Sequence, residues 1–167
     1  MTTLQSENLF LRPLSFNELL YLHNNELGSL KIFIEAEALS DSIQSAISKK
    51  IEKMKHVSDK VHQWYTYWLI IDKASEKGIG FIGFKGLSNE DSYIEVGYSI
   101  SPNYRKKGFM TEALKTLIDH TYTFKTFKGI TAKKVLKTNI GSIKVLTNCN
   151  FSLIGSDEEK YTYLLDF

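Results

Sequence analysis

The feature that most constrains the fold is an abrupt change of hydrophobic period in the middle of the chain. Between Tyr93 and Ile100, in the run YIEVGYSI, apolar residues alternate with other residues, which predicts a strand. Between Phe109 and Thr121 they recur at spacings of three and four, which predicts a helix with one apolar stripe. Pro102 prevents the strand from continuing, so the chain must pass from strand to helix through a short loop.

The segments on either side continue this mixture of strands and helices. Alternating or β-branched runs predict strands at residues 9–14, 64–71, 79–84, 130–136, 151–154 and 161–165. Helical spacing predicts helices at residues 16–27, 43–54 and 140–148, with Lys49, Lys50, Lys53 and Lys55 on the solvent side of the second. This order favours an α/β fold in which helices cover both faces of one sheet, and the 167 residues are expected to form one domain, 1–167.

Composition excludes several classes of protein. The net charge of +2 is too small to indicate nucleic-acid binding, and we expect none. No apolar run reaches the roughly 18 residues that a membrane span needs, and the first residues lack the pattern of a secretory signal. With one cysteine, Cys149, and four scattered histidines, neither a disulfide nor a metal site is expected. The sequence therefore predicts a cytoplasmic protein without a membrane segment.

Three consecutive cations, Arg105, Lys106 and Lys107, stand with Gly108 at the start of the predicted central helix. The free amides of a helix N-terminus bind anions, and a glycine lets a phosphate approach the backbone closely. Cations at the positive end of a helix are unfavourable by about 0.3–1 kcal/mol each unless an anion is bound there. A solvated loop is the alternative interpretation. The run matches neither the Walker loop nor the dinucleotide-binding fingerprint.

Residues 96–114, VGYSISPNYRKKGFMTEAL, resemble the acetyl-CoA-binding core of the GNAT superfamily of N-acetyltransferases. The signature of that family, Arg/Gln-x-x-Gly-x-Gly/Ala after a β-bulged strand, corresponds here to Arg105 through Met110. Methionine at the last position is common in the RimJ and RimL-like branch. Residues 139–151, NIGSIKVLTNCNF, resemble the asparagine-x-x-serine helix of that branch, with Asn150 in place of a glycine at a left-handed position.

The resemblance implies a GNAT fold, a largely antiparallel mixed sheet in which residues 93–100 splay from a parallel neighbour near residues 130–136. It implies that acetyl-CoA binds as co-substrate, with its pyrophosphate on the amides of the cationic loop and its thioester near the backbone of residues 97–99. The residues that the resemblance assigns to acetyl-CoA are Tyr98, Ser99, Ile100, Arg105, Lys106, Lys107, Gly108, Phe109, Met110, Asn139 and Ser142. On their own, Tyr98 is equally well explained as a core aromatic residue and Asn139 as a helix N-cap.

Catalytic groups are less well defined than the cofactor site. Glu95 lies on the central strand, where family members often have a glutamate as general base; pairing with a lysine is the alternative. Glu35 and Glu37 lie in a region that covers the acceptor pocket in the family, although solvated carboxylates would look the same. Many relatives have a tyrosine acid where this chain has Leu146, so the leaving thiolate must take its proton from water or from another residue.

The resemblance therefore implies an N-acetyltransferase that transfers an acetyl group directly to a primary amine in a ternary complex. The acceptor is a protein N-terminus or a small-molecule amine. The alternative is a catalytically silent acyl-CoA-binding sensor or scaffold. A homodimer is the default expectation for the assembly.

Overall fold

The computed structural model describes residues 1–87 and 91–167. Within them, eight strands form one sheet in the order β1-β2-β3-β4-β5-β6-β8-β7. The strands are β1 (Leu4–Gln5), β2 (Leu9–Pro13), β3 (Tyr67–Asp72), β4 (Lys77–Phe84), β5 (Tyr93–Ile100), β6 (Gly129–Leu136), β7 (Ser152–Ser156) and β8 (Lys160–Asp166). All neighbours are antiparallel except β5 and β6, which are parallel. The predicted mixed, largely antiparallel sheet is confirmed.

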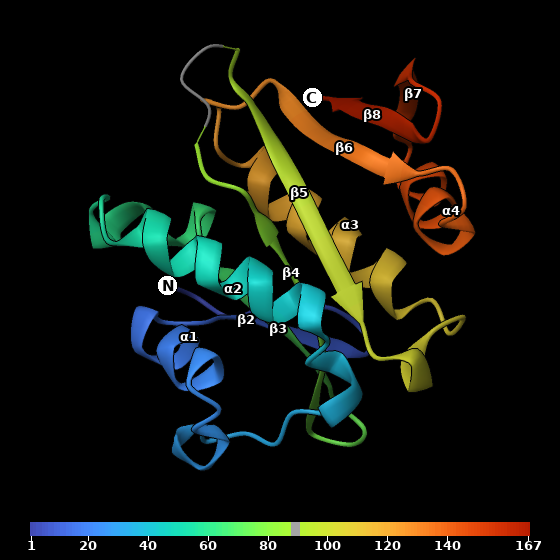
Figure 1. Cartoon of the computed structure of the whole chain (residues 1–167). Coiled ribbons are helices and arrows are strands. Elements are labelled where there is room, and N and C mark those ends of the chain that lie inside the picture. Colours follow the sequence, from blue (N-terminus) through green and yellow to red (C-terminus); the bar gives the residue numbers. More distant parts are fainter. Residues whose placement is uncertain (88–90) are drawn as a thin grey trace.

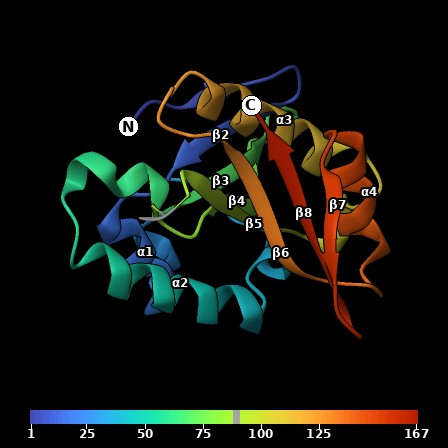
Figure 2. The same ribbon diagram turned by 90° about the horizontal axis from the view of Figure 1, so that it is seen from above.

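Helices cover both faces of this sheet, as predicted (Figure 2). They are α1 (Phe16–His23), α2 (Asp41–Met54), α3 (Phe109–Tyr122) and α4 (Ile140–Asn148). One hydrophobic core lies under α1 and α2, and the other lies under α3 and α4. Consecutive residues of β4 enter different cores, Phe81 the first and Ile82 the second, and both are fully buried. Burial on both faces explains why β3 and β4 are apolar throughout instead of alternating.

Two predicted boundaries are wrong. α1 ends at His23 rather than at residue 27, because Asn24 caps it and Asn25 takes a left-handed φ of 60°. β3 begins at Tyr67, since Trp64 belongs to the short 3₁₀ helix η3 (Asp59–Trp64). Trp64 packs there against Phe84 and other rings, so aromatic residues before β3 contribute to the core without joining the ladder.

β5 and β6 stay together over a short distance. In the described part of the chain their paired residues are Tyr93 with Gly129, Ile94 with Ile130, and Glu95 with Thr131. Beyond that last pair the strands diverge, and Figure 1 shows β5 running down the centre of the view while β6 runs toward α4. We call this divergence the fork. Its closed end is the pair of Glu95 and Thr131, and its open end lies toward Ile100 and Leu136.

A β-bulge in β6 accounts for the fork. The register of β6 with β8 shifts between Ala132 and Val135, directly after the last residue paired with β5. Within the bulge, Lys134 has a left-handed φ of 57°. A bulge bends its strand and increases the local twist, so β6 turns away at this point. β5 itself pairs with β4 in uninterrupted register from Val96 to Ile100, and the bulge expected on β5 is therefore found on its parallel neighbour.

Glu112 in the first turn of α3 fastens the N-terminal segment to that helix. Its carboxylate accepts hydrogen bonds from the Ser6 hydroxyl at 2.6 Å, the Asn8 backbone amide at 2.7 Å and the Asn8 side chain at 3.0 Å. Partial burial raises the pKa of Glu112, but the hydrogen bonds from Ser6 and Asn8 outweigh it and hold the pKa below its usual value. The carboxylate form is therefore the one that ties β1 and β2 to α3.

Replacing Glu112 by Gln should lower the free energy of unfolding by about 1–2 kcal/mol at neutral pH, because all three donors lose a charged acceptor. Since folding lowers this pKa, the stabilisation is present above the unfolded pKa and is lost as pH falls through the folded pKa. Thermal melts of both proteins across the acid range should therefore converge at low pH. Glu52→Gln, at an exposed ion pair with Lys55, is the control and should change little. A constant difference at every pH would contradict this role.

Candidate functional site

The loop between β5 and α3 leaves the helix N-terminus without a side-chain cap. Side chains of Ser15, Ser40 and Asn139 cap α1, α2 and α4, whereas the N-cap of α3 is Gly108, with φ 81°. The first bond within α3 runs from the Glu112 amide to the Gly108 carbonyl at 3.0 Å. The amides of residues 109–111 therefore have no acceptor within the helix and remain available for an anion.

The cations of this loop surround that free helix end. Arg105, Lys106 and Lys107 are exposed, and Lys107 Nζ lies 5.2 Å from the centre of the Tyr104 ring. Lys106 has a left-handed φ of 60°, so two of three consecutive residues are left-handed, an arrangement typical of anion-binding backbone concavities. A Cβ added to Gly108 would meet no atom within 4 Å. The space in front of the helix is open, and packing within the protein does not require this glycine.

Main-chain groups of β5 face the open side of the fork. The Lys85 amide donates to the Glu95 carbonyl at 2.9 Å, and the Ser101 amide donates to the Ile79 carbonyl at 2.8 Å, so odd-numbered residues of β5 bond to β4. Because the two sides alternate along a strand, the main-chain groups of Val96, Tyr98 and Ile100 point toward β6. These residues lie beyond the closed end of the fork, where β6 does not pair with β5 in the described chain. Ser99, predicted to contact the cofactor, directs its main chain toward β4 instead.

Tyr98 connects β5 with the start of α4. Its hydroxyl lies 2.9 Å from the Ser142 hydroxyl, and the Ser142 amide donates to Asn139 Oδ1 at 3.1 Å. Asn139 is therefore the N-cap of α4, which was the plainer of its two interpretations. Burial raises the pKa of Tyr98 to about 12. Leu146, at the position where many relatives have a tyrosine acid, is fully buried.

Glu95, the candidate base, and Glu35, a candidate for the acceptor pocket, are both in ion pairs. Glu95 is bound through Oε1 to Lys85 Nζ, and its side chain retains 23% exposure. Glu35 Oε1 lies 3.1 Å from Nζ of Lys77, the first residue of β4. Glu37 is exposed, as its alternative interpretation expected. Pairing with a lysine, the alternative for Glu95, is what the structure contains.

Lys50 is the residue that sequence analysis placed wrongly. It was expected on the solvent side of α2, but it is buried, and its Nζ donates to the carbonyls of Phe84 at 2.6 Å, Tyr65 at 3.1 Å and Thr66 at 3.3 Å. Burial, together with the nearby charges of Lys53 and Lys85, lowers the pKa of Lys50 to about 7. The helical spacing did not indicate that Lys50 is buried, because other lysines surround it in the sequence.

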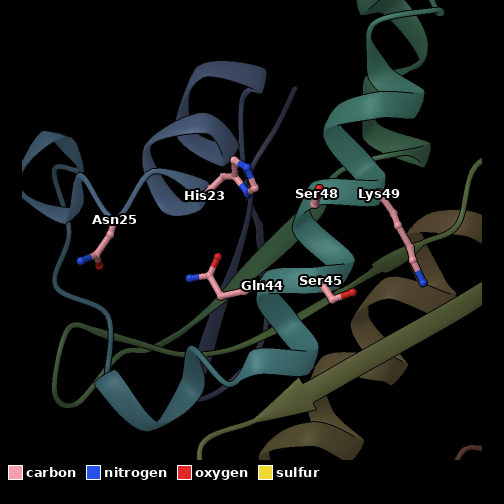
Figure 3. A pocket seen from close by; sticks show the side chains of 6 residues that line it. All are labelled: His23, Asn25, Gln44, Ser45, Ser48 and Lys49. Carbon is pink, nitrogen blue, oxygen red and sulfur yellow. The ribbon is translucent and has the colours of Figure 1, made fainter.

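Two hollows lie away from the fork. One of about 570 Å³ is bounded by α2 and the end of α1, and Figure 3 shows its polar lining, which includes His23, Gln44 and Lys49. The other, of about 360 Å³, is lined by aromatic rings that include Trp64, Phe124 and Phe127. No residue of the predicted cofactor site lines either hollow. In the described ranges, no group of three His, Cys, Asp or Glu side chains could hold a metal, and no helix is long and apolar enough to cross a membrane.

Comparison with protein families identifies this arrangement. The family model described as the acetyltransferase (GNAT) domain matches residues 8–152, which include the fork, the cationic loop and α4. The chain belongs to the GNAT acetyltransferase family. It resembles the uncharacterized N-acetyltransferase YjdG of Bacillus subtilis (strain 168), with 34% identity over 86 residues, 52% of this chain and 51% of YjdG. The chain thus spans about half the length of the curated relatives it matches.

Solved GNAT structures share the fold over nearly the whole chain. The ribosomal-protein-S5-alanine acetyltransferase from Vibrio fischeri gives a TM-score of 0.68 at 18% identity, covering 99% of this chain and 97% of that one. RimL, a ribosomal L7/L12 alpha-N-protein acetyltransferase in complex with coenzyme A, also gives 0.68 at 18% identity, covering 99% and 98%. At such identities the likeness establishes the fold alone.

The contact between Tyr98 and Ser142 can be tested by a double-mutant cycle. Tyr98→Phe and Ser142→Ala should each lower the free energy of unfolding by about 0.5–1.5 kcal/mol, and the double variant should cost less than their sum, because both changes remove one hydrogen bond. The exposed Tyr122→Phe is the control and should be neutral. Absorbance titration should show that Tyr98→Phe removes a transition near pH 12. Loss of a transition at the ordinary tyrosine pKa of about 10 would contradict the burial of this hydroxyl.

Proposed function

We propose that this protein transfers the acetyl group of acetyl-CoA to a primary amine, by direct attack within a ternary complex. The observation that carries the proposal is the uncapped N-terminus of α3 at the open end of the fork, in a chain of the GNAT family. GNAT acetyltransferases use acetyl-CoA, and both the anion site and the free strand edge suit that molecule.

The residues present fit acetyl-CoA at both ends of the fork. Its pyrophosphate would take the amides of residues 109–111, with Arg105, Lys106 and Lys107 around it and the open space at Gly108 for close approach. Its pantetheine arm would bond the free main-chain groups of Val96, Tyr98 and Ile100, as an added strand does. The fork runs about 17 Å along β5 between Glu95 and Ile100, so the thioester belongs near the closed end.

Each chemical step then has a group of this chain beside it. Glu95 takes a proton from the acceptor ammonium, and the free amine attacks the thioester carbonyl. The Tyr98 amide, which points into the fork, stabilises the oxyanion that forms. The thiolate leaves and takes a proton from the hydroxyl pair of Tyr98 and Ser142, and this pair regains a proton from the amine nitrogen, which loses its second proton as the amide forms. The hydroxyl pair thus takes the role of the tyrosine that many relatives have at the position of Leu146. Glu95 is the proposed catalytic base, and Tyr98 and Ser142 are the proposed source of the acid.

The acceptor is proposed to be an α-amine, either of a protein N-terminus or of a small molecule. At neutral pH, deprotonation costs roughly 4–5 kcal/mol for a lysine-like amine but only about 1 kcal/mol for an α-amine. The structural relatives named for ribosomal-protein alanine and for the alpha-N position of L7/L12 are consistent with such acceptors. The ion pair of Glu95 and the loss of the tyrosine acid support one alternative, a silent acyl-CoA-binding protein.

Coenzyme A and acetyl-CoA should raise the melting temperature by several degrees, since a hundredfold excess over Kd adds about 2.7 kcal/mol to the free energy of unfolding. ATP and NAD should shift it much less. Gly108→Val should abolish the coenzyme A shift while leaving the protein folded, because the new side chain enters the open space in front of α3.

Glu76→Val is the matched control for that variant. It introduces the same residue at another exposed, left-handed position, φ 57°, in the connection between β3 and β4. It should lower stability to a similar extent but leave the coenzyme A shift intact. Equal shifts for all nucleotides would indicate a nonspecific anion site, and no shift for coenzyme A would refute the proposal.

Glu95→Gln should lower kcat by about 10²–10⁴ at neutral pH with little change in affinity for coenzyme A, as expected for a general base. The loss should shrink as pH rises, because the acceptor amine then deprotonates without help. The measurement is release of free thiol from acetyl-CoA with the best acceptor in a panel of amines and N-terminal peptides. Full activity of the variant between about pH 6 and 9 would show that Glu95 is not the base. Coenzyme A binding without turnover of any amine would favour the silent alternative.

A further inference from the structure

Lys85 holds an amine at the closed end of the fork. It follows the last residue of β4, and its amide donates to the Glu95 carbonyl at 2.9 Å, so the two residues lie directly opposite each other on adjacent strands. Side chains of such a pair share one face of the sheet. The Lys85 ammonium is bound to the Glu95 carboxylate, the group that we propose as the base for the acceptor amine.

The stem of Lys85 extends along β5 toward the open side of the fork. Its Cε lies 3.9 Å from where a Cβ of Gly97 would be, and Gly97 pairs with another glycine, Gly83. The side chain therefore lies over strand backbone that carries no side chains of its own. Half of the Lys85 side chain is exposed, so it can reorient within this region.

The backbone from which Lys85 extends is fixed by α2. Lys53 Nζ donates to the Lys85 carbonyl at 2.8 Å, and the buried Lys50 Nζ donates to the carbonyl of the preceding Phe84 at 2.6 Å. Two lysines one helical turn apart thus hold two consecutive carbonyls at the end of β4. The backbone position of Lys85 is therefore set by the packing of α2 on the end of β4.

We propose that Lys85 is itself an acetyl acceptor and is acetylated by its own chain. The inference rests on the proposed function, because it uses the same base and the same thioester. An amine that already lies on the base, at the closed end of the fork, is an intramolecular nucleophile and needs no binding step. The ion pair of Lys85 and Glu95 therefore occupies the position that the proposed function gives to an acceptor amine.

The reaction balances with the groups present. The Lys85 ammonium gives one proton to Glu95, and its neutral Nζ attacks the thioester carbonyl. The C–N bond forms and the C–S bond breaks as the tetrahedral intermediate collapses. The thiolate takes the second proton lost by nitrogen, and Glu95 releases the first to solvent. The products are Nζ-acetylated Lys85, coenzyme A and one proton. Acetylation removes the positive charge that now neutralises Glu95, which leaves the carboxylate free for an external amine.

The test is incubation of the full chain with acetyl-CoA, followed by peptide mass spectrometry over time. Lys85 should gain an acetyl group at least about tenfold faster than Lys55, because effective concentration at the site exceeds that in solution. Lys55 is a matched control, since it is also exposed and paired with a carboxylate, Glu52 at 2.6 Å, but follows the last residue of α2, away from the fork. The half-time should not depend on protein concentration, as for a reaction within one chain.

Three variants separate the inference from chemical acetylation. Lys85→Arg keeps the charge but should lose the modification, Glu95→Gln should slow it by about tenfold or more, and Gly108→Val should prevent it. If Lys85 is already acetylated in the purified protein, this supports the inference provided that Lys85 is unmodified in the purified Glu95→Gln variant.

Four outcomes would overturn it. Equal labelling of Lys85 and Lys55, or labelling of Lys85 unaffected by Glu95→Gln, would mean ordinary chemical acetylation. If coenzyme A raises the melting temperature and an external amine is acetylated while Lys85 stays unmodified, the inference fails and the proposed function stands. If coenzyme A does not bind, both fail.

Discussion

The limited pairing between β5 and β6 is the constraint on which the site depends. Had the parallel ladder continued past Glu95 and Thr131, the main-chain groups of Tyr98 and Ile100 would be used within the sheet. The bulge in β6 prevents this, and it costs the sheet several hydrogen bonds near its centre. The loss is offset by the core under α3 and α4, which includes Val96 of β5 and Ala132 of β6, both beyond the last paired residues, and Leu114 of α3. Side-chain packing joins the two halves of the sheet where backbone pairing does not.

Much of this architecture could be predicted from hydrophobic period, because period reports which face of an element is buried. The range of β5 was predicted to the residue, and the left-handed position of Asn150 follows from its place after α4, where φ is 64°. The start of β3 was predicted wrongly because aromatic residues occur both in strands and in core positions outside strands, such as Trp64 in η3. The parallel pairing of β5 with β6 came from family resemblance and not from pattern, since long-range pairing leaves no local signal.

The site was predictable in its backbone part and less so in its side chains. A glycine with cations at a helix start indicates an anion site because the physics is local. The partner of Glu95 depends on the register between the end of β4 and β5, which no local pattern reveals. Lys50 illustrates the same difficulty: a lysine between Lys49 and Lys53 gives the spacing of a solvated face, and only the tertiary structure supplies three carbonyls and the Tyr67 ring, whose centre is 4.3 Å from Nζ.

Because α3 has no side-chain cap, a bound anion would supply the hydrogen-bond acceptors that its N-terminus lacks. Three amides at the start of the helix have no acceptor within it, and the cations beside them repel one another as well as the helix dipole. Without an anion, the first turn of α3 is therefore the part of the helix that opens most easily, and its amides would exchange with solvent deuterium faster than those of capped α2. An anion bound there supplies both the acceptor and the opposite charge. The residues that we propose to bind acetyl-CoA would thus make the rigidity of the central helix a measure of the occupancy of this site.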